Sequence, residues 1–133
     1  MASNKIVRFG PVALTTTTTT NILNPPTLTG GTGLAGTNSN TYMVLRHVRV
    51  VNTTAGALQV ALWLGTTGTN SSGKEVIFGG IASGGALTDG VSIAAQSYAD
   101  WYGLMRVDTA DYLVGGASNT GLTIEGEGEI GIV

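Results

Sequence analysis

The sequence predicts an all-β chain folded as a single-domain β-sandwich, and three observations predict it. Glycine is abundant, with 21 residues in 133, and threonine, serine and asparagine fill the stretches between apolar segments. Glycine and β-branched residues both disfavour helices. The apolar segments are short and recur about every 8 to 12 residues, with turn residues between them. The last stretch, 121–133, alternates polar residues with apolar residues and glycines, at the period of two typical of a strand.

The composition is that of a folded chain with a surface of low charge. Hydrophobic residues make up 42% of the sequence and charged residues 11%, against roughly a quarter charged in ordinary soluble domains. A surface of threonine, serine, asparagine and backbone suits a protein that stays bound to neighbouring subunits. The length fits one domain, cysteine is absent, and the core needs no disulfide. We expect a jelly roll of two packed sheets.

Residues 1–40 differ from the rest and predict an extended N-terminal arm and loop. A short apolar segment, 5–14, contains Pro11 and is followed by six threonines. Pro25 and Pro26 then impose extended backbone that cannot donate to a sheet ladder. We expect an arm or an edge strand, plus a long loop, with part of the region packed on a neighbouring subunit. A surface loop on its own domain is the alternative.

Residues 41–133 are expected to form the sandwich domain. The predicted strands are 42–51, 58–64, 75–78, 91–94, 97–104, 112–114 and 121–133. The predicted turns are 52–56, 65–73, 79–90 and 115–121. The strands share no internal repeat, so a solenoid or propeller is not expected.

The charge distribution disfavours nucleic-acid and membrane partners. The net charge is −2, and residues 1–52 hold four cations and no acid, whereas 53–133 hold all eight carboxylates. A chain of this polarity could pair end to end with its own kind. Four scattered cations do not form the basic stripe that neutralises several phosphates. No apolar run reaches 18 residues and no signal-peptide core is present, so we expect a soluble cytoplasmic product.

Two glycine-rich segments resemble nucleotide-binding loops in the wrong context. Residues 31–36 match the dinucleotide fingerprint, but they follow two prolines and precede residues that do not start a helix. Residues 68–74 nearly form a phosphate loop, but Glu75 stands where a hydroxyl should coordinate magnesium. We expect a loop and a hairpin tip at these places, and no cofactor.

Catalytic and metal-binding residues are not predicted. His47 is the single histidine, so no second His or Cys completes a transition-metal site. A triad through His47 would need a serine and an aspartate brought close by the fold. A glycosidase pair among Asp100, Asp108 and Asp111 stays open, although the last two flank a natural turn. We expect a packed or interface histidine and no enzyme.

The terminal strand carries a row of carboxylates on one face: Glu125, Glu127 and Glu129. A solvated outer face is expected, and calcium is the alternative if another strand or subunit supplies oxygens. Gly126 and Gly128 lie on the opposite face and indicate that a bulky side chain, Trp63 or Trp101, lies over the strand.

The segment from Tyr42 to Ile130 resembles small virion proteins of tailed bacteriophages. The resemblance is carried by the stretches TYMVLRHVRVVNTTAG, LQVALWLG, IAAQSYADWYG, DTADYLVGGAS and LTIEGEGE. Such proteins include trimeric decoration (cement) proteins on the outside of capsids and small β proteins of the tail. The resemblance implies a sandwich or jelly roll and self-association, and it transfers no functional residues.

We therefore expect a virion structural protein, made in the host bacterial cytoplasm, that binds the outside of the major capsid protein lattice as a trimer and stabilises the head. N-terminal cations would suit an acidic capsid exterior. The candidate partner contacts are Lys5, Arg8, Pro25, Pro26, Trp101 and Tyr102. The alternative is a small tail or fibre protein that binds host surface glycan. Trp101 and Tyr102 are adjacent in a strand, so one of them faces outward and could stack on a sugar.

Overall fold

A computed structural model of the protein describes residues 5–17, 20–23, 41–65, 75–83, 86–108 and 111–132. Its strands are β1 (Lys5–Ala13), β2 (Thr20–Leu23), β3 (Thr41–Asn52), β4 (Leu58–Gly65), β5 (Glu75–Phe78), β6 (Ile81–Ser83), β7 (Ala86–Asp89), β8 (Val91–Ile93), β9 (Ser97–Val107), β10 (Tyr112–Ala117) and β11 (Leu122–Ile132). Over these ranges the chain forms no helix long and apolar enough to cross a membrane.

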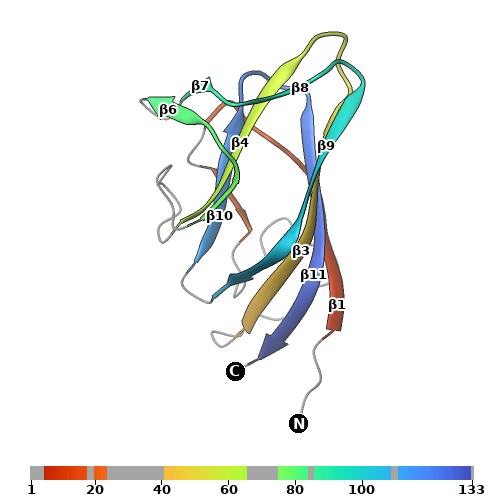
Figure 1. The fold of residues 1–133 in the computed structure, drawn as a ribbon, viewed down its shortest axis with the longest axis vertical. Helices are drawn as coiled ribbons and strands as arrows, with labels where there is room; N and C mark the ends of the chain where they lie inside the picture. Colours follow the sequence, from red (N-terminus) through yellow and green to blue (C-terminus); the bar gives the residue numbers. More distant parts are fainter. Residues whose placement is uncertain are drawn as a thin grey trace.

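Two antiparallel sheets pack face to face (Figure 1). Sheet 1 has the strand order β1-β11-β3-β9, and sheet 2 has the order β2-β10-β4-β5, with β8 also paired to β4. The pairs are nested along the chain: β1 with β11, β2 with β10, β3 with β9 and β4 with β8. Nested antiparallel pairs wound into two sheets form a jelly roll. The predicted all-β sandwich is therefore confirmed.

The core lies between the two sheets and is built from alternate residues of each strand. Its fully buried members include Phe9, Leu45, Val48, Leu62, Leu113 and Ile124. The terminal strand shows the predicted alternation. Leu122 and Ile124 are buried, and Glu127, which lies between the buried Gly126 and Gly128, is exposed. Burial of these side chains supplies the main stabilisation of the fold.

The first two strands belong to the sandwich, so the boundary predicted at residue 41 is wrong. β1 pairs with β11 along its length, and β2 pairs with β10. Phe9 is fully buried and Leu14 is 3% exposed, both in the shared core. Of the two predicted alternatives, arm and edge strand, the described residues form edge strands. Residues 24–40 lie outside the described part of the chain.

The segment predicted as the turn 79–90 contains the hairpin β6–β7, which lies against the outer face of sheet 2. Trp63 is buried on that face, and Leu87 of β7 packs against its cluster. Gly80 permits the close approach, because a Cβ there would lie 2.6 Å from the Cβ of Ala61. Glycines in this segment, which predict a turn from the sequence alone, thus allow the short hairpin to pack closely against sheet 2.

A buried asparagine joins the β3–β4 turn to the β8–β9 turn. Asn52 is 0% exposed. Its Nδ2 lies 2.9 Å from the carbonyl oxygen of Gly56, 3.0 Å from that of Ile93 and 3.2 Å from that of Ala94. Its Oδ1 accepts hydrogen bonds from the backbone N and the Oγ1 of Thr54. Both ends of the amide are satisfied, as burial requires.

Candidate interaction face

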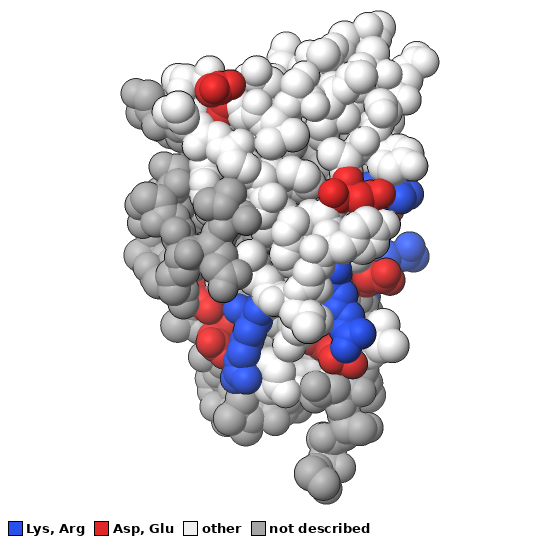
Figure 2. All heavy atoms as spheres, viewed as in Figure 1, with Lys and Arg blue, Asp and Glu red and all other residues white. Residues whose placement is uncertain are grey.

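The outer face of sheet 1 gathers most of the charged side chains in the described residues. Its charged members are Arg8, Arg46, Arg49, Arg106, Asp100, Glu125, Glu127 and Glu129. In Figure 2 most of the Lys and Arg atoms lie beside Asp and Glu atoms in the middle and lower parts of the molecule. We call this surface the polar face.

The strand order explains why charges separated in the sequence meet on the polar face. β11, which carries the three glutamates, lies between β1 and β3, which carry cations of the N-terminal part of the chain. Arg46 and Glu129 are one result, with Nη2 3.1 Å from Oε2. The basic N-terminal part and the acidic C-terminal part of the sequence therefore do not form two oppositely charged ends of the molecule. The expectation of end-to-end pairing between such ends is wrong, because their charges pair with one another within the chain.

A β-bulge at Arg46 turns His47 to the polar face. On β11, Gly128 pairs with Leu45 and Glu127 pairs with His47, so Arg46 is the extra residue of β3. The extra residue changes which side the following residues face. Leu45 is buried in the core, and His47 two positions later is only half-buried on the outside.

On the β9 side of the polar face, Asp100 holds two basic side chains of the neighbouring strand β3. Arg49 donates from Nε to Oδ1 at 2.7 Å and from Nη2 to Oδ2 at 3.0 Å, a bidentate pair. His47 Nε2 lies 2.8 Å from Oδ1 of the same carboxylate. The side chains are 16% exposed for Asp100, 21% for His47 and 35% for Arg49. We call these three side chains the triad. Their mutual hydrogen bonds fix their positions, and each of them is partly exposed to solvent.

The hydrogen bonds from Arg49 and then from His47 lower the pKa of Asp100 to about 2, against the opposing effect of partial burial. The same contact with Asp100 raises the pKa of Arg49, which stays protonated in any case. Asp100 is therefore a carboxylate at every pH of biological interest, and it holds the two basic side chains in place.

Two tyrosines of β9 flank this triad. The Tyr102 ring stacks on the His47 ring, with centroids 4.6 Å apart and planes 10° from parallel. The guanidinium carbon of Arg49 lies 4.2 Å from the centroid of the Tyr98 ring, a cation–π contact. Tyr98 is 56% exposed and Tyr102 is 70% exposed. Each ring is therefore held from one side and open to a partner on the other.

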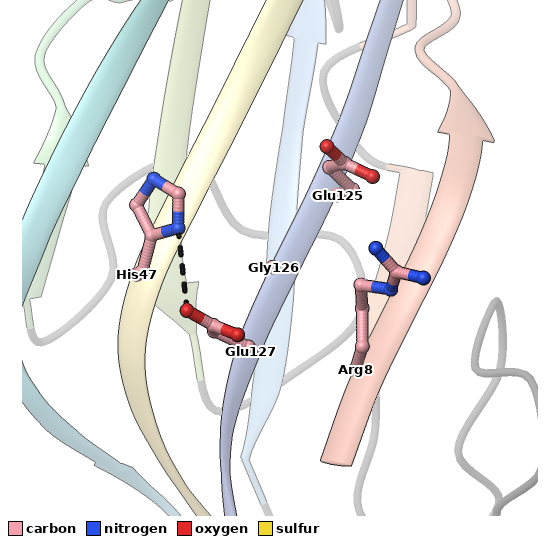
Figure 3. A pocket seen from close by; sticks show the side chains of 5 residues that line it. All are labelled: Arg8, His47, Glu125, Gly126 and Glu127. Atoms are coloured by element: carbon pink, nitrogen blue, oxygen red, sulfur yellow. Dashed lines mark ion pairs between the residues drawn. The ribbon is translucent and has the colours of Figure 1, made fainter.

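A shallow depression of about 190 Å³ lies beside His47, over β11 (Figure 3). It is lined by Arg8, His47, Glu125, Gly126 and Glu127. His47 Nδ1 lies 3.7 Å from Glu127 Oε1 across one side of it. Arg8 of β1 and Glu125 of β11 stand on its other side. The depression thus joins a cation and two carboxylates next to the triad.

The ring over the terminal strand is a phenylalanine. Phe9 covers Gly126, where a Cβ would lie 2.4 Å from its Cε1. At Gly128 a Cβ would meet the backbone oxygen of Val44. The prediction that Trp63 or Trp101 covers the terminal strand is therefore wrong. Trp63 is buried on the outer side of sheet 2, and Trp101 of β9 packs against the main core.

The polar face offers recognition groups and no assembled set of catalytic groups among its described contacts. Each ring nitrogen of His47 faces a carboxylate, so the described contacts of these two nitrogens are not to a hydroxyl or thiol that His47 could activate. Asp108 and Asp111 close a turn, with the backbone N of Asp108 donating to Asp111 Oδ2 at 2.9 Å. The described residues contain no group of three His, Cys, Asp or Glu side chains that could hold a metal ion.

The residues expected to contact a partner are only partly brought together. Arg8 and Tyr102 both lie on the polar face and are exposed. Lys5 lies at the start of β1, opposite Ile130. Trp101 is half-buried and packs against the core, so Tyr102 is the outward member of the adjacent pair. Pro25 and Pro26 lie outside the described residues.

Sequence reasoning missed Tyr98, Arg49 and Asp100 as members of this face. The signal was present, because Tyr98, Asp100 and Tyr102 alternate at the period of two along one strand. What the sequence does not contain is the register of β3 with β9, which sets Arg49 opposite Asp100.

Comparisons with known proteins found a similar solved structure but no matching family model. No family model matches the chain, and no curated protein matches it. Among solved structures, it is similar to an endo-1,4-β-D-xylanase of Clostridium thermocellum, solved as its CBM22-1 and GH10 modules in complex with xylohexaose. The identity is 12% and the TM-score 0.33, and the match covers 96% of this chain and 26% of that chain.

Proposed function

We propose that this protein is a structural component of a tailed-bacteriophage virion, a decoration protein that binds the outside of the major capsid protein lattice and stabilises the head. It is then made in the host cytoplasm and acts at the virion surface. The sequence resemblance supports the class of protein. The jelly roll fits it, because viral capsid domains are among the common users of that fold.

The observation that carries the proposal is the preorganised polar face. Tyrosine and arginine are enriched at the hot spots of protein interfaces, where a few fixed anchors provide most of the binding energy. Tyr98, Tyr102 and Arg49 are already held by intramolecular contacts. Little side-chain entropy is therefore lost when a partner covers them.

The charges of the polar face favour a protein partner over a nucleic acid. Arg46 is paired with Glu129, Arg49 with Asp100 and Arg106 with Asp108. Cations neutralised in this way do not provide a basic stripe for phosphates. A face of mixed charge and exposed aromatic rings instead suits another mixed surface, such as a capsid exterior.

The proposed stabilisation needs no chemical step. A protein that binds the assembled lattice and not the free subunits stabilises the lattice by mass action. An N-terminal deletion is not a test of how it binds, since removing residues 1–24 would take away β1 and β2 with Phe9. Binding is best tested with point variants on the polar face.

The copy number of the chain in purified virions tests the proposal. We expect quantitative mass spectrometry to give hundreds of copies per virion, in a fixed ratio to the major capsid protein. Removing the protein from such virions should lower the temperature at which heads release DNA, and adding it back should restore that temperature. A few to some tens of copies would contradict the decoration role, and absence from virions would overturn the structural role altogether.

A second candidate function, recognition of a host surface glycan by a tail or fibre protein, is favoured by the placement of the two tyrosines. β9 is the last strand of sheet 1, so the ring side of Tyr102 away from His47 faces the open edge. The Tyr102 ring could stack on a pyranose, while the side chains of Asp100 and Arg49 beside it bind the sugar hydroxyls. Loss of adsorption to host cells on Tyr102→Ala, with a low copy number, would select this candidate.

A further inference from the structure

The free edge of β9 differs from every other edge of the two sheets. β9 runs over 11 residues, Ser97–Val107. In the part of the chain that the structure describes, strands pair with β9 on one side only, through β3. An unpaired edge presents backbone N–H and C=O groups on which another strand can assemble.

The other edges carry the features that prevent such assembly. β1 contains Pro11, which has no backbone N–H, and carries Lys5 and Arg8. The edge strands of sheet 2 are short, with four residues each in β2 and β5 and three in β8. Proline, charge and short length are the usual means by which proteins protect sheet edges.

β9 has neither proline nor lysine, and its outward side chains are large. Tyr98, Tyr102 and Leu104 are 56%, 70% and 74% exposed. Its two charged residues, Asp100 and Arg106, are already paired within the chain. Against β3, β9 has one extra residue, because Gly103 and Leu104 together lie opposite Arg46. The β9 side chains keep their alternation across this bulge, with Tyr102 and Leu104 exposed and Met105 buried.

We propose that β9 pairs antiparallel with β9 of a second copy of this chain, about a two-fold axis at Gly103. This register sets Asp100 opposite the partner's Arg106 and Tyr102 opposite the partner's Leu104, all on the polar face. Opposite charges and aromatic–aliphatic pairs are the favourable cross-strand combinations. The two glycines meet at the axis, where no side chain hinders the approach of the strands.

The neighbouring registers are poorer. An axis at Tyr102 would set Asp100 opposite the partner's Leu104, a charge against an apolar side chain. An axis at Leu104 would set Asp100 opposite the partner's Asp108, which is a pair of like charges. The composition of β9 therefore selects one self-pairing, and that pairing is isologous and closed, as in most homodimers.

The pairing joins two four-stranded sheets into one continuous sheet. It also joins two polar faces into one, so a lattice or other partner would meet both sets of tyrosines together. The inference concerns the isolated protein and does not rest on the virion role. It gives a dimer, in place of the trimer expected from the sequence resemblance.

Light scattering coupled to size exclusion tests the proposal on the purified full chain. We expect twice the 13.5 kDa mass of one chain, dissociating on dilution. Leu104→Lys, on an exposed residue that does not contribute to the core, should give a monomer. Ile6→Lys is the matched control, because Ile6 is 79% exposed on the opposite edge strand of the same sheet; this variant should stay dimeric. A monomeric or trimeric wild-type protein, or an unaffected Leu104→Lys variant, would overturn the proposal.

Disulfide trapping tests the register independently, since the chain has no native cysteine. The double variant Tyr102→Cys/Leu104→Cys should form a covalent dimer on mild oxidation, because the two positions lie directly opposite across the axis. Leu104→Cys alone should not, because the partner's Leu104 is not opposite. Efficient crosslinking of the single variant, or none of the double variant, would refute the register.

Discussion

The molecule has two polar clusters that differ in burial, and the difference separates stability from recognition. Asn52 is 0% exposed and bonds only to neutral groups of two turns. Asp100 is partly exposed and bonds to the charged side chains of Arg49 and His47. A buried amide left without its partners costs stability, whereas a half-exposed ion pair contributes little to it.

The comparison indicates what each cluster is for. The Asn52 cluster determines the relative position of the β3–β4 and β8–β9 turns, so its loss should weaken the whole fold. The Asp100 cluster orients Tyr98 and Tyr102, which remain exposed. Its loss should leave the fold intact and alter what the polar face can bind.

The largest expected effect is on stability and comes from Asn52→Asp. The new carboxylate has nearly the same shape, but it offers no N–H to the three carbonyl oxygens and places negative charge against them. We expect a loss of about 3 kcal/mol in the free energy of unfolding and a fall in melting temperature of roughly 10 °C. Asn119→Asp, the same change in an exposed turn, is the control and should shift stability by less than about 0.5 kcal/mol. Equal effects of the two variants would contradict the structural role of Asn52.

A smaller effect is expected from Arg49→Ala. Asp100 keeps its contact with His47 and is partly exposed, so water can hydrate the carboxylate once Arg49 is removed. We expect a fall in melting temperature of roughly a third of that for Asn52→Asp, or less. Denaturation followed by circular dichroism would measure it. A fall as large as that of Asn52→Asp would show that the two clusters do not differ in the way proposed.

The last expected effect is a pH dependence of stability, which comes from Asp100. Its pKa is lowered to about 2 in the folded protein, against about 3.9 in an unfolded chain. The stability that its ionised form contributes is present above about pH 4 and is lost as the pH falls toward 2. The difference in stability between wild type and Asp100→Asn should therefore shrink over that interval. Denaturation of both proteins at a series of pH values would measure it, and a difference at pH 2 as large as that at pH 6 would contradict the role given to the ionised Asp100.

The fold was predictable from the sequence because the alternation of apolar residues is local. The terminal strand and 75–78 were placed correctly, since their side chains alternate or lie between clear turn signals. The segment containing Phe9 was considered as an edge strand but placed outside the sandwich domain, because Pro11 and the threonine run mask its alternation. The hairpin β6–β7 was missed because its glycines allow close packing and resemble turn residues.

The polar face was less predictable because it depends on register. Tyr102 was identified from its place next to Trp101, but the partners of Asp100 come from a strand about 50 residues away. The bulge at Arg46, which turns His47 outward, has no sequence signal of its own. The sequence therefore gives the faces of each strand and not the contacts between strands.

The central claim is that the polar face binds a partner and is not required for folding, and the double variant Tyr102→Ala/Arg49→Ala tests it most directly. Binding to capsid shells that lack the protein would be measured by co-sedimentation, alongside the melting temperature. Ile81→Ala, exposed on β6 away from the polar face, is the control. We predict that the double variant stays folded, with a Kd raised about tenfold or more, while the control binds as the wild type does. Unchanged binding by the folded double variant would contradict the claim.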